Sequence, residues 1–281
     1  MHFVNKVTKD TYAIALGNFD GVHIGHQQVI KTATQKAKEI GCKSAVVTFS
    51  PHPAKILSKN KFTEILSLED KISTIKALGV DEVIVINFTE DFSKMPAESF
   101  INELCQKFII KSITTGYNFR FGHNRHGSIR TINSLKEQYN FEFNIINQVL
   151  YNGCQISSSI LRQMINIGCV RLVSNFIGRD YTIDCVLLSK KNDYLIFKIS
   201  NLDLLFPPNA VYLGQIDDDY CCVFLIGDQI IVKMLDNDIN STNQTRIKLL
   251  SILGQELCLD QTVVDDVKGM AYINKAKFCL N

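Results

Sequence analysis

Proline and glycine are scarce in this sequence, at 5 and 15 of 281 residues, and tryptophan is absent. Together with a hydrophobic fraction of 46% and a charged fraction of 21%, this scarcity excludes a fibrous or disordered chain and predicts a globular one. The length suits one large domain or two ordinary ones. Either can bury a full core without disulfides or a structural metal.

A large excess of one charge is also lacking, since the formal net charge is only +2 and no run of Lys and Arg occurs. A general nucleic-acid partner is therefore not expected. The nine cysteines are scattered, without a CxxC pair, and only Cys221 and Cys222 are close together. This pattern favours reduced thiols in a cytosol. With no signal peptide and no apolar run of about 20 residues, we expect a soluble, cytoplasmic protein without membrane contact. Whether it forms an oligomer stays open.

The first half of the chain alternates between short β-branched runs and amphipathic runs. Residues 11–16 read as a strand, and 26–41 as a helix that ends at a capping glycine. In this helix one face is apolar and is expected in the core: Val29, Ile30, Ala33, Ala37 and Ile40. Further strands are expected at 44–49, 81–88, 111–116 and 141–149, with helices at 69–79, 96–108 and 128–140. Such alternation predicts an α/β domain with a doubly wound parallel sheet, helices covering both faces.

The alternation of strands and helices ends after two helical stretches at 157–168 and 170–178. Closely spaced strand candidates follow, separated by polar turns, at 181–189, 193–200, 210–216, 220–227 and 229–235. Among the later segments, only 245–256 looks helical. We predict a smaller C-terminal antiparallel β-barrel or sandwich, with a boundary near Gly178 that gives domains 1–178 and 179–281.

The segment "GNFDGVHIGHQQ", residues 17–28, holds two histidines between glycines at the end of the first strand. Ligands of open α/β sheets bind at that edge. Free N–H groups and the positive end of the helix dipole favour an anion there, and glycines let the backbone approach a phosphate. His23 and His26 can add hydrogen bonds to charge that develops on a phosphoryl group.

Two other interpretations of this segment compete. Imidazoles three residues apart could bind zinc, but the glutamate of HExxH is missing and Gly25 lies where a helix interior would be needed. Alternatively, the histidines could simply be exposed on a glycine-rich turn. The flanking sequence weakens that alternative.

The segment resembles the HxGH signature of the nucleotidyltransferase superfamily, in the version found in bacterial FAD synthetases, which usually carry a riboflavin kinase domain. Three further stretches agree with that family in order and spacing: "TFSPHP" (48–53), "GYNFRFGHNRHG" (116–127) and "ISSSILR" (156–162). An HxGH motif alone would fit pantetheine-phosphate, nicotinamide-nucleotide or glycerol-phosphate nucleotidyl transfer equally. The "PHP" and "FRFG" stretches look like the flavin-specific version.

The resemblance implies that FMN and ATP react to give FAD and pyrophosphate, with Mg²⁺ bridging the triphosphate. It assigns catalytic roles at the phosphates to His23, His26 and Arg162. It places ATP beside Gly17, Asn18, Phe19, Asp20, Gly21, Gly25, Ser157, Ser158 and Ser159. Asp20 would order the turn by accepting backbone N–H bonds, and turn capping alone is an equal alternative. The serines could equally be a plain helix cap, and the family more often has threonine in place of Ser159. No protein ligand of the metal is assigned.

For FMN, the resemblance implies contacts from Pro51, His52, Pro53, Asn118, Phe121 and Arg125. Pro51 and Pro53 would stiffen a loop, and Phe121 would stack on the isoalloxazine. Taken without the resemblance, these are ordinary core and loop residues. The family commonly has an acid where Ser50 stands.

In the second domain, "IGRDYTIDCVL" and "FPPNAVYLGQI" resemble the joint and a later strand of a riboflavin kinase barrel. The catalytic parts of that barrel are missing: residues 187–206 contain no glycine, threonine or PTAN, and 229–238 have isoleucine and valine where the family has its catalytic glutamate. An aliphatic side chain cannot activate a hydroxyl. The sequence therefore predicts an FMN adenylyltransferase whose riboflavin kinase activity is lost. A working bifunctional enzyme and a nucleotide- or flavin-binding regulator without turnover are the alternatives.

Overall fold

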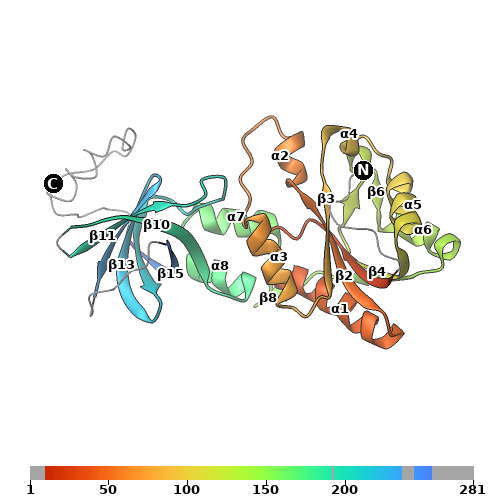
Figure 1. Cartoon of the computed structure of the whole chain (residues 1–281), viewed down its shortest axis with the longest axis horizontal. Helices are drawn as coiled ribbons and strands as arrows, with labels where there is room; N and C mark the ends of the chain where they lie inside the picture. Colours follow the sequence, from red (N-terminus) through yellow and green to blue (C-terminus); the bar gives the residue numbers. More distant parts are fainter. Residues whose placement is uncertain (1–9, 192, 236–243, 255–281) are drawn as a thin grey trace. The chain divides into compact units, whose positions relative to one another are not determined.

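The computed structural model describes residues 10–191, 193–235 and 244–254. The chain divides into two compact units, Met1–Ser158 and Ser159–Asn281, which are described separately below (Figure 1). The domain boundary expected near Gly178 stays a prediction. Within the described ranges, no helix combines the length and apolarity needed to cross a bilayer.

The first unit contains a five-stranded sheet in the order β3-β2-β1-β4-β7, in which all neighbouring strands are parallel. The strands are β1 (Thr11–Leu16), β2 (Lys43–Ser50), β3 (Glu82–Asn87), β4 (Ile109–Gly116) and β7 (Glu142–Ile146). The chain moves outward from β1 to β3 and then returns to the other side of β1. This doubly wound topology confirms the predicted fold class and puts a switch point between β1 and β4.

Helices cover both faces of this sheet (Figure 1). One apolar cluster joins β1 and β2 to α1 (Ile24–Ile40) and α3 (Leu68–Lys76), and another lies beneath α5 (Ala97–Lys107) and α6 (Ile129–Tyr139). In α1 the predicted stripe is buried at Val29, Ile30, Ala33 and Ala37. Each large side chain buried here contributes roughly 1.5 to 3 kcal/mol. Ile40 was expected on the same face but is 36% exposed, because it lies at the last residue before the Gly41 cap.

Short elements complete the first unit. They are α2 (Pro53–Leu57), α4 (Glu90–Ser93), the 3₁₀ turn η1 (His123–Arg125), and the two-residue strands β5 (Arg120–Phe121), β6 (Gly127–Ser128), β8 (Leu150–Tyr151) and β9 (Cys154–Gln155). β5 pairs with β6 and β8 with β9, both antiparallel. None of these short elements was expected from the sequence, because they are too brief to show a period.

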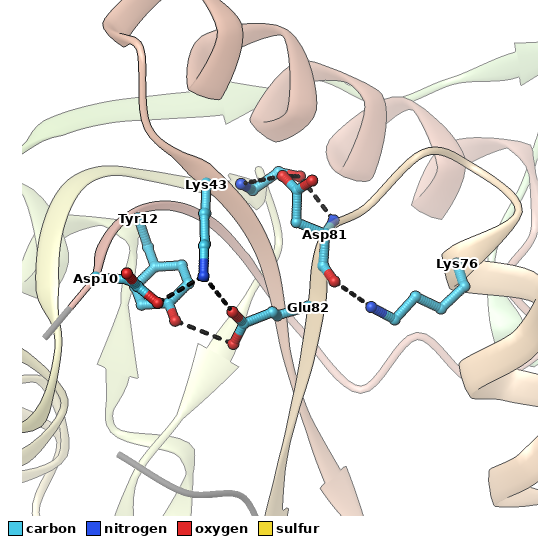
Figure 2. Close-up of polar contacts among 7 residues, drawn as sticks. Asp10, Tyr12, Lys43, Lys76, Asp81 and Glu82 are labelled. Carbon is cyan, nitrogen blue, oxygen red and sulfur yellow. Dashed lines mark hydrogen bonds and ion pairs between the residues drawn. The ribbon is translucent and has the colours of Figure 1, made fainter. Parts of the chain in front are cut away.

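A cluster of charged side chains closes the amino end of the sheet (Figure 2). Lys43 Nζ lies 2.6 Å from Asp10 Oδ2 and 3.2 Å from Glu82 Oε1, and the Tyr12 hydroxyl donates to Glu82 at 3.0 Å. The Asp81 carboxylate accepts from the Ser44 N–H and hydroxyl, and Lys76 donates to the Asp81 carbonyl. Because every charge here meets an opposite charge or a hydrogen-bond partner, we interpret this cluster as structural.

The second unit contains a closed barrel in the order β10-β11-β14-β13-β12-β15. Its strands are β10 (Tyr181–Lys191), β11 (Tyr194–Ile199), β12 (Ala210–Ile216), β13 (Asp219–Ile226), β14 (Gln229–Met234) and β15 (Gln244–Gly254). Two helices precede them, α7 (Ser158–Asn166) and α8 (Val170–Ile177), and α8 contacts β10 and β15. The predicted antiparallel barrel is confirmed.

One secondary-structure prediction was wrong. Residues 245–256 were expected to be helical, but residues 245–254 belong to the strand β15, which pairs antiparallel with β10 on one side and β12 on the other. Residues 255 and 256 lie outside the described part of the chain. Ile247 and Leu249 are fully buried inside the barrel. Their spacing of two fits a strand, and the two open edges of β10 and β12 supply hydrogen bonds that a local pattern does not reveal.

Candidate functional site

The two motif histidines lie at the carboxyl end of β1, where α1 begins. His23 is the N-cap of α1, and His26 lies in its first turn. Their rings are stacked, with centroids 3.6 Å apart and planes 17° from parallel, and the Phe19 ring meets His26 edge-on at 5.4 Å. His23 is only 5% exposed. The alternative in which both histidines are merely exposed on a turn is therefore wrong.

Hydrogen bonding fixes the tautomer of His23. Its Nδ1 accepts the backbone N–H of His26 at 3.2 Å, so in the neutral ring the proton is on Nε2. Nδ1 of His26 is enclosed and has no hydrogen-bond partner within the described part of the chain. Nε2 is therefore the atom of each ring that can reach a ligand. His23 caps α1 and His26 lies in its first turn, where the free N–H groups of the helix favour an anion.

Burial keeps both rings uncharged near neutral pH. It lowers the pKa of His23 from 6.5 to about 4, while the Asp20 carboxylate and the backbone of His23 itself oppose the shift. Burial also holds the pKa of His26 well below its usual value, and the neighbouring His23 and Lys71 push it in the same direction. The neutral His23 ring carries its proton on Nε2 and can donate it in a hydrogen bond.

Acid should destabilise this protein through His23. Between pH 6.5 and about 4 the unfolded chain binds a proton that the folded ring does not, so the free energy of unfolding falls as the pH falls through this window. The loss should approach about 3 kcal/mol near pH 4 and vanish above pH 7. Urea unfolding at several pH values measures it. In His23→Asn the pH dependence should be smaller by up to about one proton, and an unchanged dependence would contradict the assignment.

The backbone between the strand and the helix is strained. Phe19 and Val22 have φ of 52° and 42°, a region that costs a non-glycine residue on the order of 1 to 3 kcal/mol. Gly21 adopts φ 79° without that cost. A Cβ at Gly25 would lie 3.1 Å from the His23 ring, and one at Gly17 equally close to Phe19. The glycines thus leave room for the aromatic rings.

Asn18 and Asp20 are held by partners from distant parts of the chain. The Asn18 carbonyl accepts the Thr48 hydroxyl at 3.0 Å. Asp20 is buried, and its carboxylate accepts the Ile65 N–H at 3.1 Å. Asp20 therefore fastens the turn to the segment before α3.

The "PHP" stretch forms the loop between β2 and α2. The Ser50–Pro51 peptide is cis, and Pro53 is the first residue of α2. His52 caps this helix, with Nδ1 accepting the Ala54 N–H at 3.1 Å, and its ring stacks on Phe62 at 4.5 Å. The ring thus has a structural role, and its proposed contact with FMN stays a prediction.

The "FRFG" stretch follows β4. Asn118 and Arg125 are exposed, whereas Phe121 is 7% exposed and stacks on the half-buried Phe119 at 5.3 Å. Phe119, which was not singled out from the sequence, is the more accessible of the two rings. The flavin contact expected of Phe121 stays a prediction.

The serine segment lies at the division between the two units. Ser158 belongs to the first unit, and its hydroxyl donates to the Asp20 carbonyl at 3.1 Å, which brings it to the histidine turn. Ser157 is half-buried just before it. Ser159 and the half-buried Arg162 lie on α7 in the second unit. Their roles as ATP ligands stay predictions.

The sequence analysis did not single out two residues that lie near the histidine turn. Lys71 is 5% exposed, and Glu64 accepts the His52 N–H at 2.9 Å. A signal for Lys71 was present, because it lies four residues before the buried Ile75 on the apolar face of α3. Glu64 lies outside any periodic segment and gave no signal.

The chain resembles known proteins in both units. The sequence profile described as FAD synthetase matches residues 5–160, more than half of the chain. A bifunctional riboflavin kinase/FMN adenylyltransferase of Buchnera aphidicola is 34% identical over 186 residues, 65% of this chain and 59% of that protein. The Bacillus subtilis protein of the same name is 32% identical over 220 residues, 75% of this chain and 69% of that protein.

A solved structure agrees over nearly the whole length. The crystal structure of a macrolide-efflux protein from Streptococcus pneumoniae superimposes with a TM-score of 0.79 and covers 96% of this chain and 95% of that one, at 21% identity. At this identity the similarity supports the fold alone. The sequence relatives and the matched profile together settle the family: this chain belongs to the FAD synthetases.

Proposed function

We propose that this chain transfers the adenylyl group of ATP to FMN, giving FAD and pyrophosphate in the cytoplasm. The observation that carries the proposal is the stacked pair of neutral imidazoles at the N-terminus of α1, beside the switch point of a parallel sheet. The named relatives combine this activity with riboflavin kinase activity.

In the proposed reaction, a phosphate oxygen of FMN attacks the α-phosphorus of ATP, and the bond to the leaving pyrophosphate breaks in line. No covalent enzyme intermediate forms. His23 and His26 donate from Nε2 to phosphate oxygens, and the N–H groups at the start of α1 add further donors. Arg162 neutralises charge on the β and γ phosphates, a role proposed from the family resemblance.

Magnesium is proposed to enter as part of the substrate, MgATP. Among the residues that the structure describes, no group of three or more His, Cys, Asp or Glu side chains could hold a metal ion. The triphosphate itself supplies oxygen ligands, which Mg²⁺ prefers. The chain's own contribution is then to position the phosphates.

For the second unit we propose that riboflavin kinase activity is lost. A riboflavin kinase needs a flexible phosphate-binding loop in the span that corresponds to residues 187–206. In this chain that span includes the end of β10 and all of β11. On β14, Ile230, Ile231 and Val232 are fully buried where a catalytic acid would have to reach substrate. A bifunctional enzyme is the second candidate, favoured by the full names of the relatives.

One assay separates these functions. The purified chain is incubated with ATP, Mg²⁺ and either FMN or riboflavin, and the flavins are resolved by chromatography. FAD from FMN alone supports the proposal. FMN formed from riboflavin supports the bifunctional enzyme, and flavin binding without product supports a regulator.

A further inference from the structure

Two loops of the candidate site leave neighbouring strands of the sheet. The histidine turn, residues 17–23, follows β1, and the "PHP" loop, residues 51–53, follows β2. Because β1 and β2 pair in parallel, both loops lie at the same edge. Within the "PHP" loop His52 supplies the one backbone N–H, since proline has none and its ring fixes φ. A group that binds this N–H therefore holds a loop that is already stiff.

A short segment between α2 and α3, residues 62–65, contacts both loops. Glu64 Oε1 accepts the His52 N–H at 2.9 Å, and the Phe62 ring stacks on the His52 ring at 4.5 Å. The next residue, Ile65, donates its N–H to the carboxylate of the buried Asp20, in the histidine turn, at 3.1 Å. Two consecutive residues thus connect the histidine turn to the "PHP" loop.

This connection is short and stiff. One planar peptide bond joins Glu64 to Ile65 and fixes their Cα atoms about 3.8 Å apart. Both hydrogen bonds have a carboxylate acceptor, and such bonds are roughly twice as strong as neutral ones. Lys55 Nζ lies 3.4 Å from Oε2 of Glu64, the carboxylate oxygen that His52 does not use. The Glu64 side chain is only 16% exposed, so water competes little for these contacts.

We propose that Glu64 is a positioning residue of the nucleotidyl-transfer site: its carboxylate holds the "PHP" loop while the adjoining Ile65 N–H holds the histidine turn, so that residues 62–65 set the distance between the two loops. The inference rests on the proposed function, in which the histidine turn binds the phosphates of ATP and the "PHP" loop lies beside FMN. Their separation then decides whether the FMN phosphate meets the α-phosphorus in line. Glu64 acts through these contacts and is not assigned a contact with substrate.

Hydrogen exchange tests the connection without turnover. In Glu64→Ala the His52 N–H loses its acceptor, and the 62–65 segment loses one of its two attachments. In NMR of the ligand-free protein, the His52 and Ile65 amides should exchange about tenfold faster or more than in the wild type, while that of Val47, inside β2, stays protected. Glu64→Gln keeps an acceptor oxygen at the same reach and should exchange like the wild type. Unchanged exchange at Ile65 in Glu64→Ala means that the two contacts are independent, which overturns the proposal.

Turnover tests the role in catalysis. At saturating ATP and FMN, kcat for FAD formation should fall roughly tenfold to a hundredfold in Glu64→Ala, since a misplacement of about 1 Å costs up to this much. The KM for ATP should stay within about twofold, because the variant leaves the His23 cap and the N–H groups of α1 in place. Glu64→Gln should keep most of the rate. An unchanged kcat, with only a higher KM for FMN or a lower melting temperature, contradicts a positioning role.

Lys55→Gln is the matched control. It removes the ion pair with Glu64 but leaves the hydrogen bond to His52, so its kcat should stay near the wild-type value. A loss as large as that of Glu64→Ala would assign the effect to the charge pair and sink the proposal.

A further variant decides the matter if Glu64→Ala does not fold. Glu64→Asp keeps the charge but reaches one methylene less far, so it should lose rate where Glu64→Gln does not. The reverse order would make Glu64 a charge and not a positioning group. Should the wild type make no FAD, the proposed function fails, and hydrogen exchange still decides whether residues 62–65 connect the two loops.

Discussion

Replacing His26 by alanine is expected to lower kcat for FAD formation about 10²-fold or more while the chain stays folded. The variant loses one donor that is already oriented by its stack on His23 and its edge contact with Phe19. A preorganised donor of this kind contributes roughly 10²- to 10³-fold to rate. The measurement is the rate at saturating ATP and FMN.

Circular dichroism and thermal unfolding provide the control for His26→Ala. Because the His26 side chain accepts no backbone hydrogen bond within the described structure, removing it should leave α1 intact. A folded variant with a near-wild-type rate would remove His26 from the mechanism.

His23→Asn is expected to lose activity about as strongly, roughly 10²- to 10³-fold, without losing stability at neutral pH. Asparagine is a favourable N-cap, and its side-chain oxygen can accept the His26 N–H that Nδ1 of His23 accepts now. It cannot replace the Nε2 donor. Kinetics combined with urea unfolding at pH 7.5 therefore separates the capping role from the chemical one.

His23→Ala is the matched comparison. It loses the donor and the cap together, so it should be as inactive as His23→Asn and about 1 kcal/mol less stable than that variant. If His23→Asn retained most of the wild-type rate, the residue would be a cap and nothing more.

Much of the fold could be predicted because its signals are local. β-branched runs and apolar helix faces gave all five strands of the parallel sheet and its main helices, and left-handed glycines mark the helix ends at Gly41 and Gly178. The prediction failed at β15, whose conformation depends on pairing with β10 and β12. The partners of a strand that pairs with distant residues cannot be identified from a local sequence pattern.

The candidate site also has features that the sequence predicts and features that depend on packing. The position of His23 and His26 at a strand-to-helix junction was evident from the sequence, because the glycines and the helical period lie beside them. Their stacking, the enclosed Nδ1 of His26 and the low pKa of His23 were not, since each depends on what is packed around the rings.

The sequence by itself determined the alternation of strands and helices, the histidine motif at the end of the first strand and the resemblance to FAD synthetases. These are properties of neighbouring residues, whose spacing and backbone preferences act within a few positions. Only the tertiary structure brought Asp20 to Ile65 and Glu64 to His52, and closed the barrel with β15. Burial and charge pairing depend on distance in space, and folding brings these segments of the chain together.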